Sequence, residues 1–162
     1  MKKVYIYRIV TFVLLVSLMV VIFSFSAQTA NESRKTSTGF KIILFEKFYP
    51  HFKEFSKAKQ QEILDSFSFP VRKAAHFSLY FTLGLFSFLF IVSFKSFKMI
   101  YRFILSFEIC LLYSISDEIH QIFVPGRGGM ISDVLIDCSG TLLCLLILFY
   151  IIKNKKIRKL VE

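Results

Sequence analysis

Residues 117–129 hold most of the side chains in this sequence that could do chemistry. This stretch of thirteen residues, DEIHQIFVPGRGG, places two carboxylates, an imidazole and an amide just before a Pro-Gly-Arg turn. It closes a long apolar segment, and a charged residue at the centre of a membrane helix costs about 2.5–3.5 kcal/mol on insertion scales. A chain tolerates that cost where such groups face one another or a water-filled cavity. We therefore expect the functional site here.

Polar side chains also recur at the spacing that places them on one helix face. The sets are Arg72 and His76; Asp117, His120 and Gln121; and Asp133 and Asp137. Asp117 and Asp137 are each ten residues from Arg127, so a helical hairpin would bring them to the same depth. At 1.5 Å per residue this level is roughly 10 Å below the helix ends. The Pro125-Gly126 pair favours a type II turn that would hold Arg127 over a pocket.

Four apolar stretches must position these groups, at residues 4–25, 74–94, 100–124 and 130–152. Each reaches the length of about 20 residues that a helix needs to cross the hydrocarbon core. With 55% hydrophobic residues in a chain of 162, we predict one all-α membrane domain, residues 1–162, with four transmembrane helices.

The first apolar stretch follows a basic start, as the apolar part of a signal peptide does. Its apolar run is longer than the usual 7–15 residues, however, and no A-x-A cleavage site follows it. We predict a retained transmembrane helix.

The net charge of +10 is distributed as in a membrane protein, and we expect no nucleic-acid partner. Three basic clusters flank the predicted spans: Lys2, Lys3 and Arg8; Lys95, Lys98 and Arg102; and Lys153, Lys155, Lys156, Arg158 and Lys159. Four spans place all three clusters on one side, which the positive-inside rule makes cytoplasmic. We predict a multi-pass protein of the cell membrane with both termini in the cytoplasm, in contact with anionic lipids.

The segment 27–73 between the first two spans would then lie outside. Residues 27–39 are polar and typical of turns, whereas residues 40–69 are aromatic and amphipathic. Ser56 is placed to cap a short helix, and Pro70 is expected to break the chain before the second span. We interpret the segment as an interfacial amphipathic helix on the bilayer, with a lid over the site as the alternative.

Small residues, among them Gly84 and Gly140, favour close packing of the helices. The cysteines 110, 138 and 144 all fall in apolar spans and have the spacing of neither a disulfide framework nor a zinc site, so we expect buried hydrophobic residues. Glu108 lies in the middle of the third span, on roughly the opposite face from Asp117, and has no assigned role.

Three segments resemble the signatures of a known family. They are RKAAHF at 72–77 with Tyr80 and Gly84; DEIHQIFVPGR at 117–127 with Asp133, Asp137 and Gly140; and FSFSAQ at 23–28. Together they resemble the VanZ-like family of small bacterial integral membrane proteins, named for a member that raises tolerance to teicoplanin. The resemblance implies a role at the cell envelope and no established reaction.

Two kinds of function fit these residues. In the first, Arg72 and Arg127 bind an anionic group of a lipid-linked phosphate, a lipid headgroup or a cell-wall precursor through charge-assisted hydrogen bonds. The neighbouring polar side chains would orient the arginines and bind sugar or amide groups of the ligand. These ligand-binding candidates are Glu118, Gln121, Asp133 and Asp137.

In the second, the protein is an intramembrane hydrolase or transferase for lipid-linked phosphates. His120 would be the general base or nucleophile, oriented by Asp117, and His76 the partner acid. A metal site using Asp117, His120, Asp133 and His76 is a third option, but no spacing is diagnostic, and we predict neither metal nor organic cofactor. The sequence leaves open whether the protein catalyses a reaction. It also leaves open the oligomeric state of the protein.

Overall fold

The computed structural model of the chain describes residues 2–94 and 96–153. Within these ranges the fold is entirely helical, with the elements α1 (Lys2–Ser26), α2 (Ala30–Phe48), η1 (Phe52–Glu54), α3 (Lys57–Ser66), α4 (Ser68–Val92), α5 (Met99–Ile122) and α6 (Ile131–Lys153). The helices α1, α4, α5 and α6 are long and apolar enough to cross a membrane, and each contains an 18-residue stretch with a mean hydropathy of 2.7, 1.8, 1.5 and 2.3, respectively. This confirms the predicted all-α membrane protein with four candidate spans.

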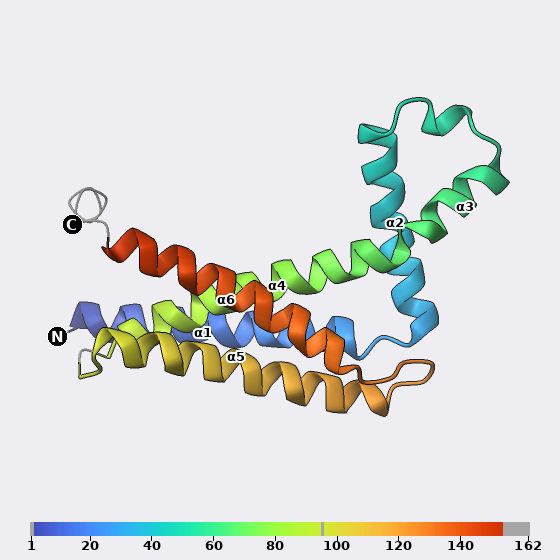
Figure 1. Cartoon of the computed structure of the whole chain (residues 1–162). Coiled ribbons are helices and arrows are strands. Elements are labelled where there is room, and N and C mark those ends of the chain that lie inside the picture. The colour runs from blue at the N-terminus through green and yellow to red at the C-terminus, as the bar shows by residue number, and fades with distance from the viewer. Residues whose placement is uncertain (1, 95, 154–162) are drawn as a thin grey trace.

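The four long helices form a bundle that determines where the polar residues meet. The helix α6 packs against α4 and α5, and α1 packs chiefly against α4. Figure 1 shows the start of α1 and the end of α6 at one end of this bundle, whereas α2 leaves from the other. Of the basic residues used to predict orientation, Lys95, Lys155, Lys156, Arg158 and Lys159 lie outside the described residues.

Close contact between α4 and α6 depends on two small residues. A Cβ atom added to Gly140 would lie 2.4 Å from the backbone oxygen of Phe77, so only glycine allows this approach. At Gly84 an added Cβ would lie 3.2 Å from the Thr141 side chain. Both glycines allow the close packing of helices that the sequence predicted. The buried core beside them contains Leu15, Ile22, Tyr80, Leu83 and Cys110.

The other two cysteines fit the prediction of buried hydrophobic residues in part. Cys144 is buried like Cys110, Cys138 is half-buried, and all three are free thiols. Glu108 is exposed on the outer face of α5, away from the bundle interior.

The second span begins earlier than predicted. The helix α4 starts at Ser68, and Pro70 is its third residue rather than a break before it. Proline is tolerated there because the first four N–H groups of a helix have no partner within that helix. As a result Arg72, Lys73 and His76 all belong to the first turns of a continuous helix.

The outer segment also differs from its prediction. Residues 27–39 were expected to form turns, but α2 begins at Ala30 behind a capping box in which Thr29 and Glu32 exchange hydrogen bonds. The predicted cap is confirmed at Ser56, whose hydroxyl accepts from the Lys59 amide at 3.3 Å. Figure 1 shows α2 crossing the end of the bundle and α3 returning to the start of α4.

A small core holds the outer segment together. Phe45, Phe52 and Leu64 form a buried cluster between α2, η1 and α3. The side chain of Lys41 has no exposed surface, and its Nζ atom donates to the Leu64 carbonyl oxygen at 2.7 Å and to the Ser68 hydroxyl. Lys41 therefore ties α2 to the junction of α3 and α4.

Candidate functional site at the end of the helix bundle

A pocket of about 620 Å³ lies where α2 crosses the end of the bundle. Its walls come from α2, the end of α3, the first turns of α4, the end of α5, the loop before α6 and the first turn of α6. We call it the end pocket; its ionisable lining residues are Arg34, Asp65, Arg72, His76, Arg127 and Asp133. Gln121 also lines it, so five of the nine residues singled out from the sequence face one cavity.

Arg127 is held over the end pocket by the predicted turn. Gly126 has a φ of 75°, and the Arg127 amide donates to the Val124 carbonyl oxygen at 3.0 Å, as a type II turn about Pro125-Gly126 requires. The Arg127 guanidinium donates to the side-chain oxygen of Gln121 and to the Phe25 carbonyl oxygen, both at 3.2 Å. These acceptors are neutral. Burial and the nearby Arg72 lower the pKa of Arg127.

Behind Arg127 lies a layer of buried carboxylates on α5. The Gln121 amide nitrogen donates to Asp117 at 3.0 Å and to Glu118 at 3.1 Å, and the Ser26 hydroxyl donates to Asp117 at 2.7 Å. Glu118 also accepts from the Met130 amide at 2.8 Å. Gln121 thus connects both carboxylates to Arg127, and α1 and the loop before α6 are fixed to the same layer.

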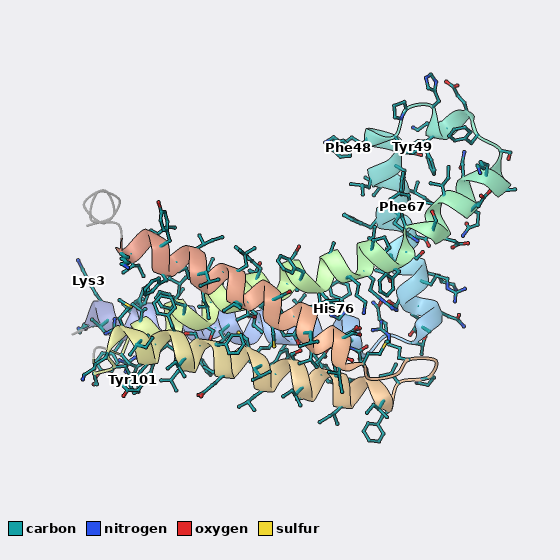
Figure 2. All side chains as sticks on the ribbon, in the orientation of Figure 1. Lys3, Phe48, Tyr49, Phe67, His76 and Tyr101 are labelled. Atoms are coloured by element: carbon teal, nitrogen blue, oxygen red, sulfur yellow. The ribbon has the colours of Figure 1, made fainter. Side chains whose placement is uncertain are left out.

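His76, which lines the end pocket, pairs with a buried carboxylate behind it. His76 on α4 lies 3.5 Å from Asp137 on α6, measured from Nδ1 to Oδ1. Asp137 has no exposed surface, and its other oxygen accepts from the Ser114 hydroxyl on α5 at 2.8 Å. Figure 2 labels His76 at the end of the bundle from which α2 departs. Because Ser114 is three residues from Asp117, the two aspartates lie at neighbouring levels, as counting from Arg127 predicted.

The comparison with protein families gives one match, to the VanZ/LLP1 family model over residues 11–153. The chain belongs to the VanZ/LLP1 family. The match covers nearly the whole sequence, including all the residues of the end pocket, and confirms the resemblance inferred from the signatures. The comparisons with curated proteins and with solved structures gave no match.

The remaining residues singled out from this VanZ/LLP1 chain lie at the edge of the site. Asp133, in the first turn of α6, forms an ion pair with Lys73 of α4, which neutralises its charge. The His120 ring packs in a tilted arrangement against Phe23 of α1, with ring centroids 4.6 Å apart, and His120 does not line the end pocket. The described hydrogen bonds of Asp117 go to Ser26 and Gln121. The imidazole that lines the pocket is that of His76, 3.5 Å from Asp137.

Sequence reasoning missed the part of the VanZ/LLP1 site that α2 and α3 contribute. Ser33, Arg34 and Ser37 of α2 and Asp65 of α3 all line the end pocket. One signal was available: Thr29-x-x-Glu32 is a capping-box pattern and predicts a helix starting at residue 30. The capping-box pattern does not predict that this helix would cross the end of the bundle.

Among the described residues, no group of three or more histidine, cysteine, aspartate or glutamate side chains is arranged to hold a metal ion. The end pocket brings together three arginines, an imidazole beside a carboxylate, and several hydroxyl groups. Such a set can bind an anion and exchange a proton with it.

Proposed function

We propose that this VanZ/LLP1 protein binds an anionic, lipid-linked ligand in the end pocket. One observation carries the proposal: Arg72 and Arg127 both line the pocket, and no described ion pair neutralises either of them. Arg127 is half-buried and Arg72 is exposed. Guanidinium groups without an ion-pair partner favour a phosphate or carboxylate, which they bind through paired hydrogen bonds. Gln121 supports the role because it orients Arg127 without neutralising it.

The charge pattern favours an extracytoplasmic position for the pocket. The described basic flanks, Lys2, Lys3, Arg8, Lys98, Arg102 and Lys153, belong to the bundle end opposite α2 in Figure 1. Under the positive-inside rule that end is cytoplasmic, so both termini would be inside and the end pocket would open at the outer surface of the cell membrane. A headgroup or cell-wall precursor there is the ligand that a role in the cell envelope, including glycopeptide tolerance, would require.

The position of α2 fits an interfacial helix. It crosses the long axis of the bundle (Figure 1) and exposes large apolar side chains such as Phe40, Ile43 and Phe48. A helix with this pattern lies in the headgroup region with its apolar face toward the acyl chains. In that position α2 also forms one wall of the end pocket, so the interfacial and lid interpretations describe the same helix.

The test is lipid retention. The wild-type protein, purified in mild detergent, is incubated with a total lipid extract, and its bound lipids are identified by mass spectrometry. Arg72→Gln and Arg127→Gln should each lose the anionic lipids that the wild type retains. Lys98→Gln, which removes a charge at the opposite end of the bundle, should retain them. Equal retention by all four proteins would refute a pocket-specific anion site.

A second candidate function is supported by the pair of His76 and Asp137. An imidazole that lines the pocket with a carboxylate 3.5 Å away is the arrangement of a general base. In a hydrolase or transferase His76 would take a proton from an attacking water or hydroxyl, with Arg72 and Arg127 stabilising charge on the phosphate. The first assignment, His120 with Asp117, remains the alternative. A product formed by the wild type and lost in His76→Ala or His120→Ala would decide between the two.

A further inference from the structure

A second cavity of about 350 Å³ adjoins the end pocket on the side of α1. Its walls are mainly apolar, formed by Phe25 of α1, Phe40 of α2 and Val71, Ala75 and Leu79 of α4. We call this cavity the side groove. Its volume is at the lower end of the range, about 300–1,000 Å³, that small-molecule sites occupy.

The side groove and the end pocket are two parts of one site. Five residues line both cavities: Ser33, Ser37, Arg72, His76 and Arg127. The two cavities therefore share a wall that contains both arginines. The combination of a cationic polar compartment and an apolar one matches the two parts of a lipid.

The direction of the side groove matches that of a hydrocarbon chain. Val71, Ala75 and Leu79 are spaced four residues apart along α4, so they form a stripe along one face of the helix. At 1.5 Å per residue the stripe is about 12 Å long. It runs along a membrane-spanning helix, which is also the direction of lipid chains in a bilayer.

The charge of the end pocket points to the class of headgroup. Three arginines and two aspartates line the pocket, and Lys73 neutralises one of the aspartates, Asp133. Among the lining residues an excess of about two positive charges remains, in front of the buried carboxylates of Asp117 and Glu118. A phosphate monoester carries about −1.5 to −2 charges at pH 7 and fits this excess, whereas a phosphodiester carries a single charge.

We propose that the ligand is a lipid that ends in a phosphate monoester, with its phosphate at Arg72 and Arg127 and one hydrocarbon chain in the side groove. This inference rests on the proposed function, since it assumes that the end pocket binds the anionic part. It adds the class of headgroup and the place of the chain, and both can be tested separately from binding itself.

The chain contains no tryptophan, so a single introduced tryptophan can report on the groove. Phe40→Trp places the reporter in the side groove, and Phe48→Trp places a matched control on the same helix, outside it. Phe48 is labelled in Figure 2 at the far end of α2, and both positions are exposed, at 59% and 69%. Each variant is reconstituted in nanodiscs of phosphatidylcholine, and the probe is a lipid with brominated chains, which quench tryptophan fluorescence on contact.

Brominated phosphatidic acid, a monoester, should quench Phe40→Trp several-fold more than equal amounts of brominated phosphatidylglycerol or brominated phosphatidylcholine. Phe48→Trp should show no such preference, and Arg72→Gln added to Phe40→Trp should remove it. Equal quenching by the monoester and the diester would overturn the headgroup assignment. Equal quenching by all three lipids would overturn the side groove as the place of the chain.

A groove-filling variant gives the second test. Ala75→Phe narrows the side groove, whereas Ala74→Phe adds the same ring at an exposed neighbouring position that lines neither cavity. Retention of phosphatidic acid in detergent should fall at least five-fold in Ala75→Phe and stay unchanged in Ala74→Phe. If the wild type and Ala75→Phe retain it equally while Arg127→Gln loses it, the side groove is refuted and the anion site stands. If none of the proteins retains it, the proposed function itself fails.

Discussion

The Nδ1 atom of His76 lies 3.5 Å from the Oδ1 atom of Asp137, across the interface between α4 and α6. Asp137 is entirely buried, and Ser114 of α5 donates to its second oxygen. One carboxylate therefore joins three membrane helices directly beneath the end pocket. Any change at Asp137 acts on the architecture of the bundle and on the histidine that lines the site.

Removal of this carboxylate should destabilise the bundle. Asp137→Ala leaves the Ser114 hydroxyl and the His76 ring without their partner, and loss of one member of a buried pair costs about 3 kcal/mol. Asp137→Asn keeps an acceptor for Ser114 and should cost less than Asp137→Ala. Thermal unfolding in detergent, followed by circular dichroism, measures both. Ser139→Ala, on the exposed face of the same helix, is the control and should change stability by under about 0.5 kcal/mol.

Two glycines should respond to alanine with opposite signs. In Gly140→Ala the new Cβ would lie 2.4 Å from the backbone oxygen of Phe77, so α4 and α6 must move apart, at a cost of about 1–3 kcal/mol. Gly39 lies inside α2 with nothing within 4 Å of its added Cβ. Gly39→Ala should therefore stabilise α2 by about 0.5–1 kcal/mol, as expected for a helix interior. The same unfolding measurement tests both, and a loss of stability in both would contradict this account of Gly39.

The membrane bundle could be predicted from the sequence because its signals are local. Long apolar runs define spans, and residues three or four apart share a helix face whatever surrounds them. Pro125-Gly126 predicted the turn, and equal distances from Arg127 predicted the matching levels of Asp117 and Asp137. Which polar groups pair with one another could not be predicted. Lys73 with Asp133 and His76 with Asp137 are contacts between helices, and they depend on how each helix is rotated about its own axis, which the spacing of residues in the sequence does not determine.

The structure of the outer segment was predicted less well than that of the membrane bundle. Its polar residues 27–39 suggested turns, yet Thr29 and Glu32 satisfy the free N–H groups of a helix that starts at Ala30. The early start of α4 was missed because a proline in the first turn looks like a helix break. Arg34 and Asp65 were absent from the predicted site because the position of α2 and α3 over the bundle depends on tertiary contacts such as those of Lys41.

Lys41 should make the outer segment sensitive to pH. Burial lowers the pKa of Lys41, since desolvation disfavours the charged amine in the folded protein. Between this lowered value and the ordinary value of about 10.4, the unfolded segment binds more protons than the folded one. Stability of the segment should therefore rise as pH increases through that window. Hydrogen exchange of α2 and α3 amides, with each rate divided by the intrinsic rate at that pH, measures the change.

Two variants isolate the contribution of Lys41. Lys41→Met loses the hydrogen bonds to Leu64 and Ser68, so protection should fall at all pH values and its rise with pH should disappear. Hydrogen bonds from a charged group contribute about 1.5–3 kcal/mol each. Lys47→Met, at an exposed position of the same helix, should keep both the protection and the rise. A pH response that persists in Lys41→Met would assign it to another group.

Gln121 should act on ligand binding through Arg127 alone. Its oxygen accepts from the Arg127 guanidinium, while its nitrogen donates to Asp117 and Glu118. Gln121→Ala removes no charge, yet retention of anionic lipid should fall several-fold because Arg127 loses its orientation. Gln60→Ala, at a half-buried position on α3 that lines neither cavity, should leave retention unchanged.

A double-mutant cycle separates this positioning role from a general loss of structure. If Gln121 acts by orienting Arg127, the double variant Gln121→Ala with Arg127→Gln should retain as much lipid as Arg127→Gln alone. If Gln121→Ala merely loosens the bundle, the two losses should add, and thermal unfolding should show the same shift in both backgrounds. Non-additive binding would therefore identify the link between the buried carboxylates of α5 and the arginine over the pocket as part of the binding machinery.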